Sequence, residues 1–167
     1  AALQPFLGTD ALSLPQDIGP AIDLTLTASS TPSAGDPAGA IPPTDLTLDV
    51  TSEKLNGRGA FRLEADRVST TGEGLTLTLA QVGSVLERTG ALGETVRLNK
   101  PGWLRLTLAG LDLPLDADGA PVPEKATGDA ELRIAGVVVA ANNEAASFDN
   151  LVAALALTPD AAPVLTL

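Results

Sequence analysis

The stretch Gly102-Trp103-Leu104-Arg105-Leu106-Thr107-Leu108 decides the fold, because apolar and polar side chains alternate along it one by one. A period of two is that of a β-strand, in which successive side chains point to opposite faces of the sheet. The leucines are expected on one face, and the arginine and threonine on the other. Such half-buried strands are typical of antiparallel or mixed sheets, since buried parallel strands are apolar throughout.

The same alternation predicts five more strands, at Ile22–Leu26, Leu46–Val50, Phe61–Ala65, Leu75–Leu79 and Ala130–Ile134. The run Leu151–Leu157 is compatible with a strand, and also with a helix that Ser147 would cap. We prefer the strand, because Thr158-Pro159-Asp160 would then turn the chain into a last strand at Val164–Leu167.

Helical signals are short. Leu79–Arg88 carries an apolar stripe with Gly90 as a stop, and the residues around Ala2–Leu7 resemble the tail of a similar element. Two stretches rich in Pro or Gly, Ser29–Thr44 and Asp116–Gly128, are predicted to be loops, the second with a turn at Asp118-Gly119.

These elements predict a mostly β fold: one curved antiparallel or mixed sheet of about seven or eight strands with one or two short helices. We expect residues 1–167 to be a single β-rich domain and a fragment of a longer chain. A weak internal repeat relates residues 1–79 to residues 80–167, and chance similarity remains an alternative because Leu-Thr-Leu recurs easily in this composition.

The composition excludes several classes of protein. The 167 residues include no His and no Cys, which removes the commonest general base, thiolate nucleophiles and disulfides. The net charge of −11 argues against a nucleic-acid partner. The longest apolar stretches, Ile134–Asn143 and Asn150–Pro159, have about half the length that a bilayer-spanning helix needs.

Two candidate sites are weighed against structural roles. Asp112, Asp116 and Asp118 before Gly119 could bind a hard cation. The expected calcium-loop ligands are missing, however, and a strand ending in an Asp-Gly turn is preferred. Ser84 lacks the glycine pattern of a nucleophile elbow. Without His it would need a lysine as partner, and none stands in a recognisable relation to a serine; the candidates are Lys54, Lys100 and Lys125.

Carboxylate pairs suited to glycosidase chemistry, Glu64/Asp66 and Asp23/Asp49, are expected on the polar strand faces, and aromatic platforms for a sugar are scarce. The glycine pairs Gly57/Gly59 and Gly72/Gly74 are interpreted as turns between strands, because neither leads into a helix. The basic group Lys54, Arg58, Arg62 and Arg67 is interrupted by acidic residues and predicts a solvated hairpin. We therefore expect no enzymatic activity, no metal and no cofactor.

The apolar strand faces are the remaining candidate. They are aliphatic and nearly free of aromatic rings, which suits an ordinary core and also a smooth groove for acyl chains. The residues predicted to line such a groove are Leu24, Leu26, Leu46, Leu48, Leu63, Leu77, Leu106 and Leu132.

The chain resembles the AsmA-like, TamB-like superfamily of bacterial envelope proteins, which is related to the bridge-like lipid-transfer proteins. The resemblance rests on Leu79–Arg88 followed by a Gly/Pro turn into Gly102–Leu108, and on Gly136–Val139 leading to Phe148–Leu157. The second stretch contains Asn-Leu-x-Ala-x-Leu at Asn150–Leu155. The chain departs from the family's pattern at Thr158–Pro163, where an Asp-Gly turn would be usual.

The resemblance implies a groove-shaped β-sheet, in a parent protein anchored in the inner membrane, that carries phospholipid or other acyl chains across the periplasm. It implies no catalytic residues. The alternative function is a structural or adhesive β-module of a secreted or surface protein, with Ser29–Thr44 and Asp116–Gly128 as partner contacts.

Overall fold

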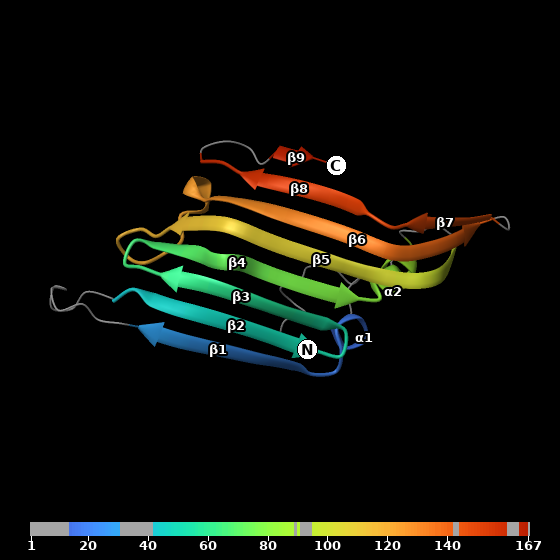
Figure 1. Cartoon of the computed structure of the whole chain (residues 1–167), viewed down its shortest axis with the longest axis horizontal. Coiled ribbons are helices and arrows are strands. Elements are labelled where there is room, and N and C mark those ends of the chain that lie inside the picture. The colour runs from blue at the N-terminus through green and yellow to red at the C-terminus, as the bar shows by residue number, and fades with distance from the viewer. Residues whose placement is uncertain are drawn as a thin grey trace.

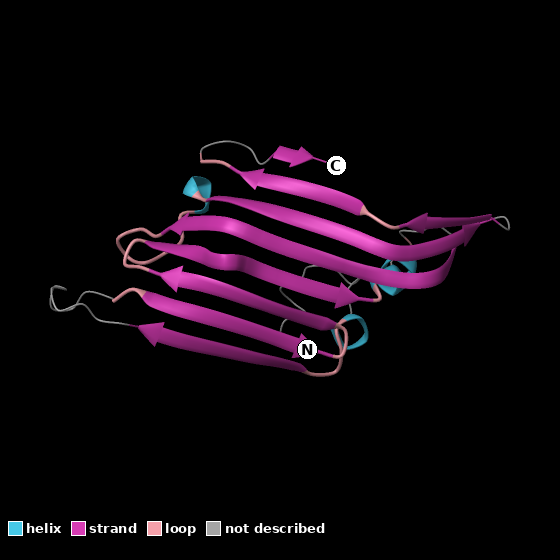
Figure 2. Cartoon of the chain, viewed as in Figure 1, coloured by secondary structure: helices cyan, strands magenta, loops and turns pink. Residues whose placement is uncertain are grey.

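The computed structural model describes residues 14–30, 42–88, 90, 95–141, 144–159 and 164–166. Within them the chain forms one open antiparallel sheet of nine strands (Figure 1). The spatial order is β1-β2-β3-β4-β5-β6-β8-β9, and β7 pairs with β6 on the same side as β8. Helical segments are short and lie at the ends of strands (Figure 2).

The strands are β1 (Ile22–Ser30), β2 (Thr44–Ser52), β3 (Leu55–Leu63), β4 (Arg67–Ala80), β5 (Arg97–Pro114), β6 (Thr127–Ala141), β7 (Glu144–Phe148), β8 (Leu151–Leu157) and β9 (Val164–Thr166). The helical segments are α1 (Leu14–Asp17), α2 (Val82–Arg88) and the 3₁₀ turn η2 (Pro123–Lys125).

The predicted fold class is confirmed: the chain is mostly β, and its main sheet is antiparallel and unclosed. Each stretch of alternating residues lies within a longer strand, except that Glu64 and Ala65 lie beyond the end of β3. Leu151–Leu157 is a strand, so the helical alternative is wrong there. It pairs antiparallel with β9, as the turn at Thr158–Asp160 predicts.

The predicted helix Leu79–Arg88 is wrong at its start, because β4 continues to Ala80 and α2 begins at Val82. Leu79 stays in the sheet since it lies opposite Leu55 on one side and Leu104 on the other. Gln81 changes the chain direction with a left-handed φ of 58°, and its N–H donates to the Gly102 carbonyl at 2.8 Å. The helix predicted around Ala2–Leu7 lies outside the described residues.

The two glycine pairs are not turns, which corrects the sequence interpretation. Gly57 and Gly59 lie inside β3, and Gly72 and Gly74 inside β4. A Cβ on Gly57 would lie 2.3 Å from Leu77 Cδ2, and one on Gly59 would lie 2.7 Å from the Phe61 ring. The glycines of β3 thus make room for large side chains that lie across them, and those of β4 form an irregularity in the register.

The predicted loops are shorter than Ser29–Thr44 and Asp116–Gly128, because the outer residues of both stretches pair in strands. Ser29 and Ser30 belong to β1, Thr44 to β2, and Thr127 and Gly128 to β6. The strand β7 is absent from the prediction. Its sequence, Glu-Ala-Ala-Ser-Phe, does not alternate, and it is a strand because it pairs with Val137–Ala141 of β6.

The buried core of the described residues is small and lies at the α2 end of the sheet. Val82 of α2 packs with Val137 and Val139 of β6. Gly136 has a φ of 70° and its neighbour Gly102 a φ of 60°. The left-handed Gly136 interrupts the regular alternation of side chains between the two faces of β6. As a result Val137, three positions after Ile134, packs in the same hydrophobic cluster as Ile134. Near this point β5 and β6 bend (Figure 1).

Among the described residues, no helix has the length and the apolar composition that crossing a membrane requires.

Candidate apolar binding face

The register places aliphatic residues opposite one another across the whole sheet, in three transverse rows that we call the apolar face. Residues directly opposite each other in antiparallel strands share a face. The first row is Leu24, Val50, Gly57, Leu77, Leu106, Leu132 and Ala153, and the second is Leu26, Leu48, Gly59, Leu75, Leu108, Ala130 and Leu155. The third consists of the pair Ile22 and Ser52 and, beyond the turn between β2 and β3, of Leu55, Leu79, Leu104, Ile134 and Leu151.

All eight residues predicted to line a groove lie on this face. Six belong to the first two rows: Leu24, Leu26, Leu48, Leu77, Leu106 and Leu132. Leu46 and Leu63 lie further along β2 and β3, two and four residues from Leu48 and Gly59, and so point the same way. The structure therefore brings together residues that are more than a hundred positions apart in the sequence.

The described residues do not cover this face with a second layer. The buried hydrophobic residues are Val50, Val82, Ala126, Ala135, Val137 and Val139, and none of the eight predicted leucines is among them. Leu24 and Leu26 of the edge strand are 64% and 60% exposed. The leucines of the inner strands are partly buried, because each is flanked by side chains of the strands on both sides.

The two helices close one end of the apolar face. A Cβ on Gly83 of α2 would lie 2.6 Å from Leu98 Cδ1, so α2 packs tightly on the start of β5. The carboxylate of Asp17 in α1 forms an ion pair with Arg88 of α2. The carbonyl of Ile18 accepts hydrogen bonds from Ser52 Oγ at 2.7 Å and from the Lys54 N–H at 2.9 Å, which fixes α1 to the hairpin between β2 and β3.

The opposite face of the sheet is polar. One of its rows runs Thr25, Asp49, Arg58, Thr76, Thr107, Glu131 and Ala154. Arg58 Nε lies 3.5 Å from Asp49 Oδ1, and Arg62 Nε lies 3.2 Å from Glu64 Oε1. These pairs are exposed, as the predicted solvated hairpin requires, and we expect each to contribute little to stability.

Arg67 is the centre of a second exposed group on the hairpin. Its guanidinium donates to Asp66 at 3.1 Å and to Asp112 at 3.2 Å. The hydrogen bond from Arg67 lowers the pKa of Asp66, since it stabilises the charged carboxylate. The proposed carboxylate pair Glu64/Asp66 is therefore held by arginines, and Asp23/Asp49 lies on the polar face of β1 and β2.

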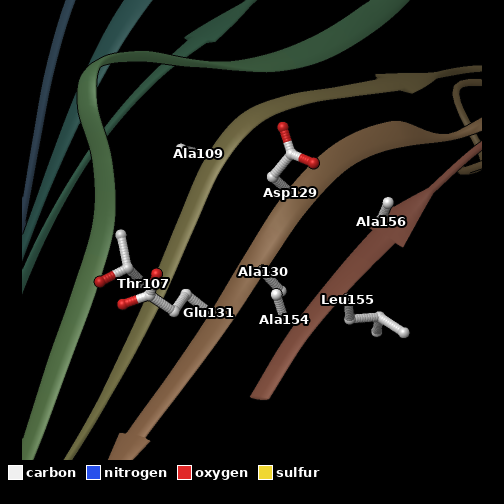
Figure 3. A pocket seen from close by; sticks show the side chains of 8 residues that line it. All are labelled: Thr107, Ala109, Asp129, Ala130, Glu131, Ala154, Leu155 and Ala156. Carbon is white, nitrogen blue, oxygen red and sulfur yellow. The ribbon is translucent and has the colours of Figure 1, made fainter. Parts of the chain in front are cut away.

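The polar face also holds a depression of about 450 Å³ between β5, β6 and β8. It exists because small side chains line it: Ala109, Ala154 and Ala156 stand where larger residues would fill the space. Figure 3 shows Thr107 beside Glu131, with Asp129 further along the same strand. Sequence reasoning missed this depression, and the alanines that alternate with larger residues in β8 are the signal for it.

The acidic group considered for a metal ion has a structural role. Asp116 Oδ1 accepts hydrogen bonds from the backbone N–H groups of Asp118 at 2.9 Å and of Ala120 at 2.8 Å. Asp112 accepts from Arg67, on the other side of the turn. The Asp-Gly turn is thus confirmed, and no group of three or more possible metal-ligating side chains is found among the described residues.

The serine and the lysines considered for nucleophilic catalysis lie in different elements, and no hydrogen bond is found between them in the part of the chain that the structure describes. Ser84 lies in the first turn of α2, where its N–H donates to the Gln81 carbonyl at 3.0 Å. Lys54 Nζ donates to the Gln16 carbonyl at 2.6 Å, Lys100 is an exposed residue of β5, and Lys125 lies in η2.

Comparison of the chain with protein-family models, with curated proteins and with solved structures finds no match.

Proposed function

We propose that this chain is a non-enzymatic lipid-binding segment of a bacterial cell-envelope protein of the AsmA-like kind, and that its apolar face holds acyl chains. The observation that carries the proposal is the combination of three mostly aliphatic rows with the lack of a covering layer among the described residues. A sheet that is apolar on one face normally buries that face against another element. Here an acyl chain would provide the apolar contact.

The dimensions of the face suit an acyl chain. Eight strands in sequence, spaced at about 4.8 Å, make a face about 34 Å wide. One leaflet of a bilayer has a hydrocarbon depth of about 15 Å, so an extended acyl chain would cross three or four strands. Each methylene that leaves water contributes about 0.8 kcal/mol, and this contribution needs no hydrogen-bonding group on the protein.

The cellular setting is part of the same proposal. We place the segment in the periplasm, in a parent protein anchored in the inner membrane, with phospholipid or another acylated molecule as the cargo. The resemblance of Gly102–Leu108 and Asn150–Leu155 to the AsmA-like superfamily supports this setting. No catalytic group takes part, because acyl-chain transfer along an apolar face breaks no covalent bond.

The test compares two neighbouring residues on opposite faces of the exposed strand β1. Leu26→Asp places a charge on the apolar face, and Thr27→Asp places the same charge on the polar face, opposite Thr47. Neither substitution disturbs a buried residue, so we expect both variants to fold. Lipid that copurifies is measured by mass spectrometry, and uptake is measured with a fluorescent phospholipid.

We expect the Leu26→Asp variant to take up less lipid than the natural chain and the Thr27→Asp variant to take up the same amount. Equal losses in the two variants, or a natural chain without copurifying lipid and without uptake, would overturn the proposal.

One observation favours the second candidate, a structural or adhesive β-module. The edge strand β1 has nine residues, only one of which, Asp23, is charged. Natural edge strands are commonly protected by charges, prolines or bulges against pairing with another chain. A module of this kind would bind a protein strand at β1, and it would show no lipid uptake in the experiment above.

A further inference from the structure

Eight of the ten basic residues of the chain, all except Lys54 and Lys125, fall into two groups. Arg58, Arg62, Arg67 and Arg88 each form an ion pair with an aspartate or a glutamate. Segments 97–105 of β5 and 133–140 of β6 pair with each other, and we call these two segments the basic ribbon. They carry four other basic residues: Arg97, Lys100, Arg105 and Arg133. None of these four forms an ion pair with a described residue, and the basic ribbon contains no Asp or Glu. This concentration of positive charge occurs in a chain with a net charge of −11.

Arg105 and Arg133 are direct cross-strand partners. Like charges directly opposite each other destabilise a sheet. Their neighbours on the same row are Thr78 of β4 and Val152 of β8, neither of which can neutralise them. The contrast with β3 is clear, since Arg58 and Arg62 there face Asp49 and Asp45 of β2. The repulsion between Arg105 and Arg133 would be relieved by an anion that lies across both.

Trp103 adds an amphipathic ring to the basic ribbon. It is the only tryptophan of the chain, it is partly exposed, and the guanidinium of Arg105 lies 5.2 Å from the centre of its ring. An indole ring beside cationic side chains is suited to the interface between water and lipid, because the ring is apolar and its N–H remains hydrogen-bonded.

The basic ribbon is accessible because the helices cover the other side of the sheet. Gly83 of α2 packs against Leu98 and Pro101 of β5. Arg97 and Lys100, which flank these two residues, are exposed, as are Arg105 and Arg133. Along β5 the ribbon extends over about 26 Å, at about 3.3 Å per residue, which exceeds the reach of a single small anion.

We propose that the basic ribbon docks the protein onto a membrane surface that carries phosphate-bearing anionic lipids. The four cations contact lipid phosphates, and Trp103 enters the headgroup layer. Each basic residue near such a surface strengthens binding about fivefold. The acidic residues of β2 and β3 do not cancel this attraction, because salt screens charges beyond about 10 Å. Glu131 is the nearest acidic residue of β6, two positions from Arg133.

This inference does not rest on the lipid-binding role of the apolar face, because the ribbon and that face lie on opposite sides of the sheet. The test uses the whole chain with vesicles of phosphatidylcholine alone or of phosphatidylcholine mixed with phosphatidylglycerol. Binding is followed by cosedimentation and by the emission of Trp103. We expect binding and a blue shift with the anionic vesicles, both weakened by added salt, and neither with the neutral vesicles.

The double variant Arg105→Gln/Arg133→Gln should bind anionic vesicles about 25-fold more weakly. The matched control, Arg58→Gln/Arg62→Gln, removes the same charge from arginines that already face carboxylates, and it should lose far less. Equal losses in the two double variants would overturn the proposal, since they would indicate an effect of net charge alone. Equal binding to both kinds of vesicle would also overturn it, and so would a blue shift produced by inorganic phosphate without vesicles. Lipid uptake by the Leu26→Asp variant reports on the apolar face separately.

Discussion

Asp17 and Arg88, 71 positions apart in the sequence, form an ion pair that joins α1 to α2. Asp17 is 5% exposed, whereas the Arg88 side chain remains about a third exposed. The pair lies at the closed end of the apolar face and connects the segment before β1 to the segment before β5. We expect this contact to stabilise the helical end of the sheet.

Replacement of Asp17 tests this contact. Asp17→Asn removes the charged carboxylate of this ion pair, and we expect the free energy of unfolding to fall by about 1–3 kcal/mol, less than for a fully buried pair because Arg88 is partly hydrated. Urea denaturation measures the loss. Hydrogen exchange of the Lys54 N–H, which donates to the Ile18 carbonyl, should also accelerate. The control Arg62→Gln, in an exposed pair, should change stability by at most about 0.5 kcal/mol. A smaller effect for Asp17→Asn than for the control would contradict the prediction.

Gly102 and Gly110 have the same left-handed conformation in β5 and different surroundings. Their φ values are 60° and 59°. A Cβ on Gly102 would lie 2.4 Å from the Ala135 carbonyl oxygen, whereas a Cβ on Gly110 would meet nothing within 4 Å. Gly110→Ala should lower the free energy of unfolding by about 1–2 kcal/mol, because alanine is strained in the left-handed conformation. Gly102→Ala should cost more, because β5 and β6 must also move apart. Thermal unfolding of both variants checks the order, and equal losses would show that the close approach to β6 is unimportant.

The hydrogen bond between Arg67 and Asp66 makes a pH-dependent contribution. The pKa of Asp66 is lower in the folded chain than its ordinary value of 3.8. The ionised Asp66 carboxylate therefore stabilises the folded chain above about pH 4. This stabilisation is lost as the pH falls through the pKa that Asp66 has in the folded chain. In an Arg67→Gln variant, an NMR titration of the Asp66 carboxyl carbon should show the pKa rising toward 3.8. Arg58→Gln should leave it in place, and an unchanged value in both variants would refute the assignment.

The apolar face should respond unevenly to the loss of leucine side chains. Leu26 is 60% exposed at the edge of the sheet, whereas Leu106 is partly buried between β4 and β6. Leu26→Ala should cost less than about 1 kcal/mol and Leu106→Ala about 2–3 kcal/mol, since the cost follows the apolar area withdrawn from water. Urea denaturation without lipid measures both. A large loss at Leu26 would show that the edge of the face is covered in solution, and the face would then be a closed core there.

The strands were the most predictable part of the fold, and the glycines the least. Alternation along Gly102–Leu108 and five similar stretches predicted strands because the period of two is a local property of the chain. Gly57 and Gly59 were misjudged, since what keeps them in β3 is the Leu77 and Phe61 side chains that lie across them. Leu79 was assigned both to the end of a strand and to the start of a helix, because its partner Leu104, which keeps it in the sheet, lies 25 positions further along the sequence.

The sequence by itself determined that this protein is a sheet with one aliphatic and one polar face, because residue type and the period of two are encoded locally. It also determined the eight leucines of the proposed groove, which the strand register places on one face. Only the tertiary structure decided that Arg105 lies opposite Arg133, that Asp17 meets Arg88, and that the alanines of β8 border a depression. These relationships depend on register and on chain reversals through bulges and left-handed glycines, which no short stretch of sequence specifies.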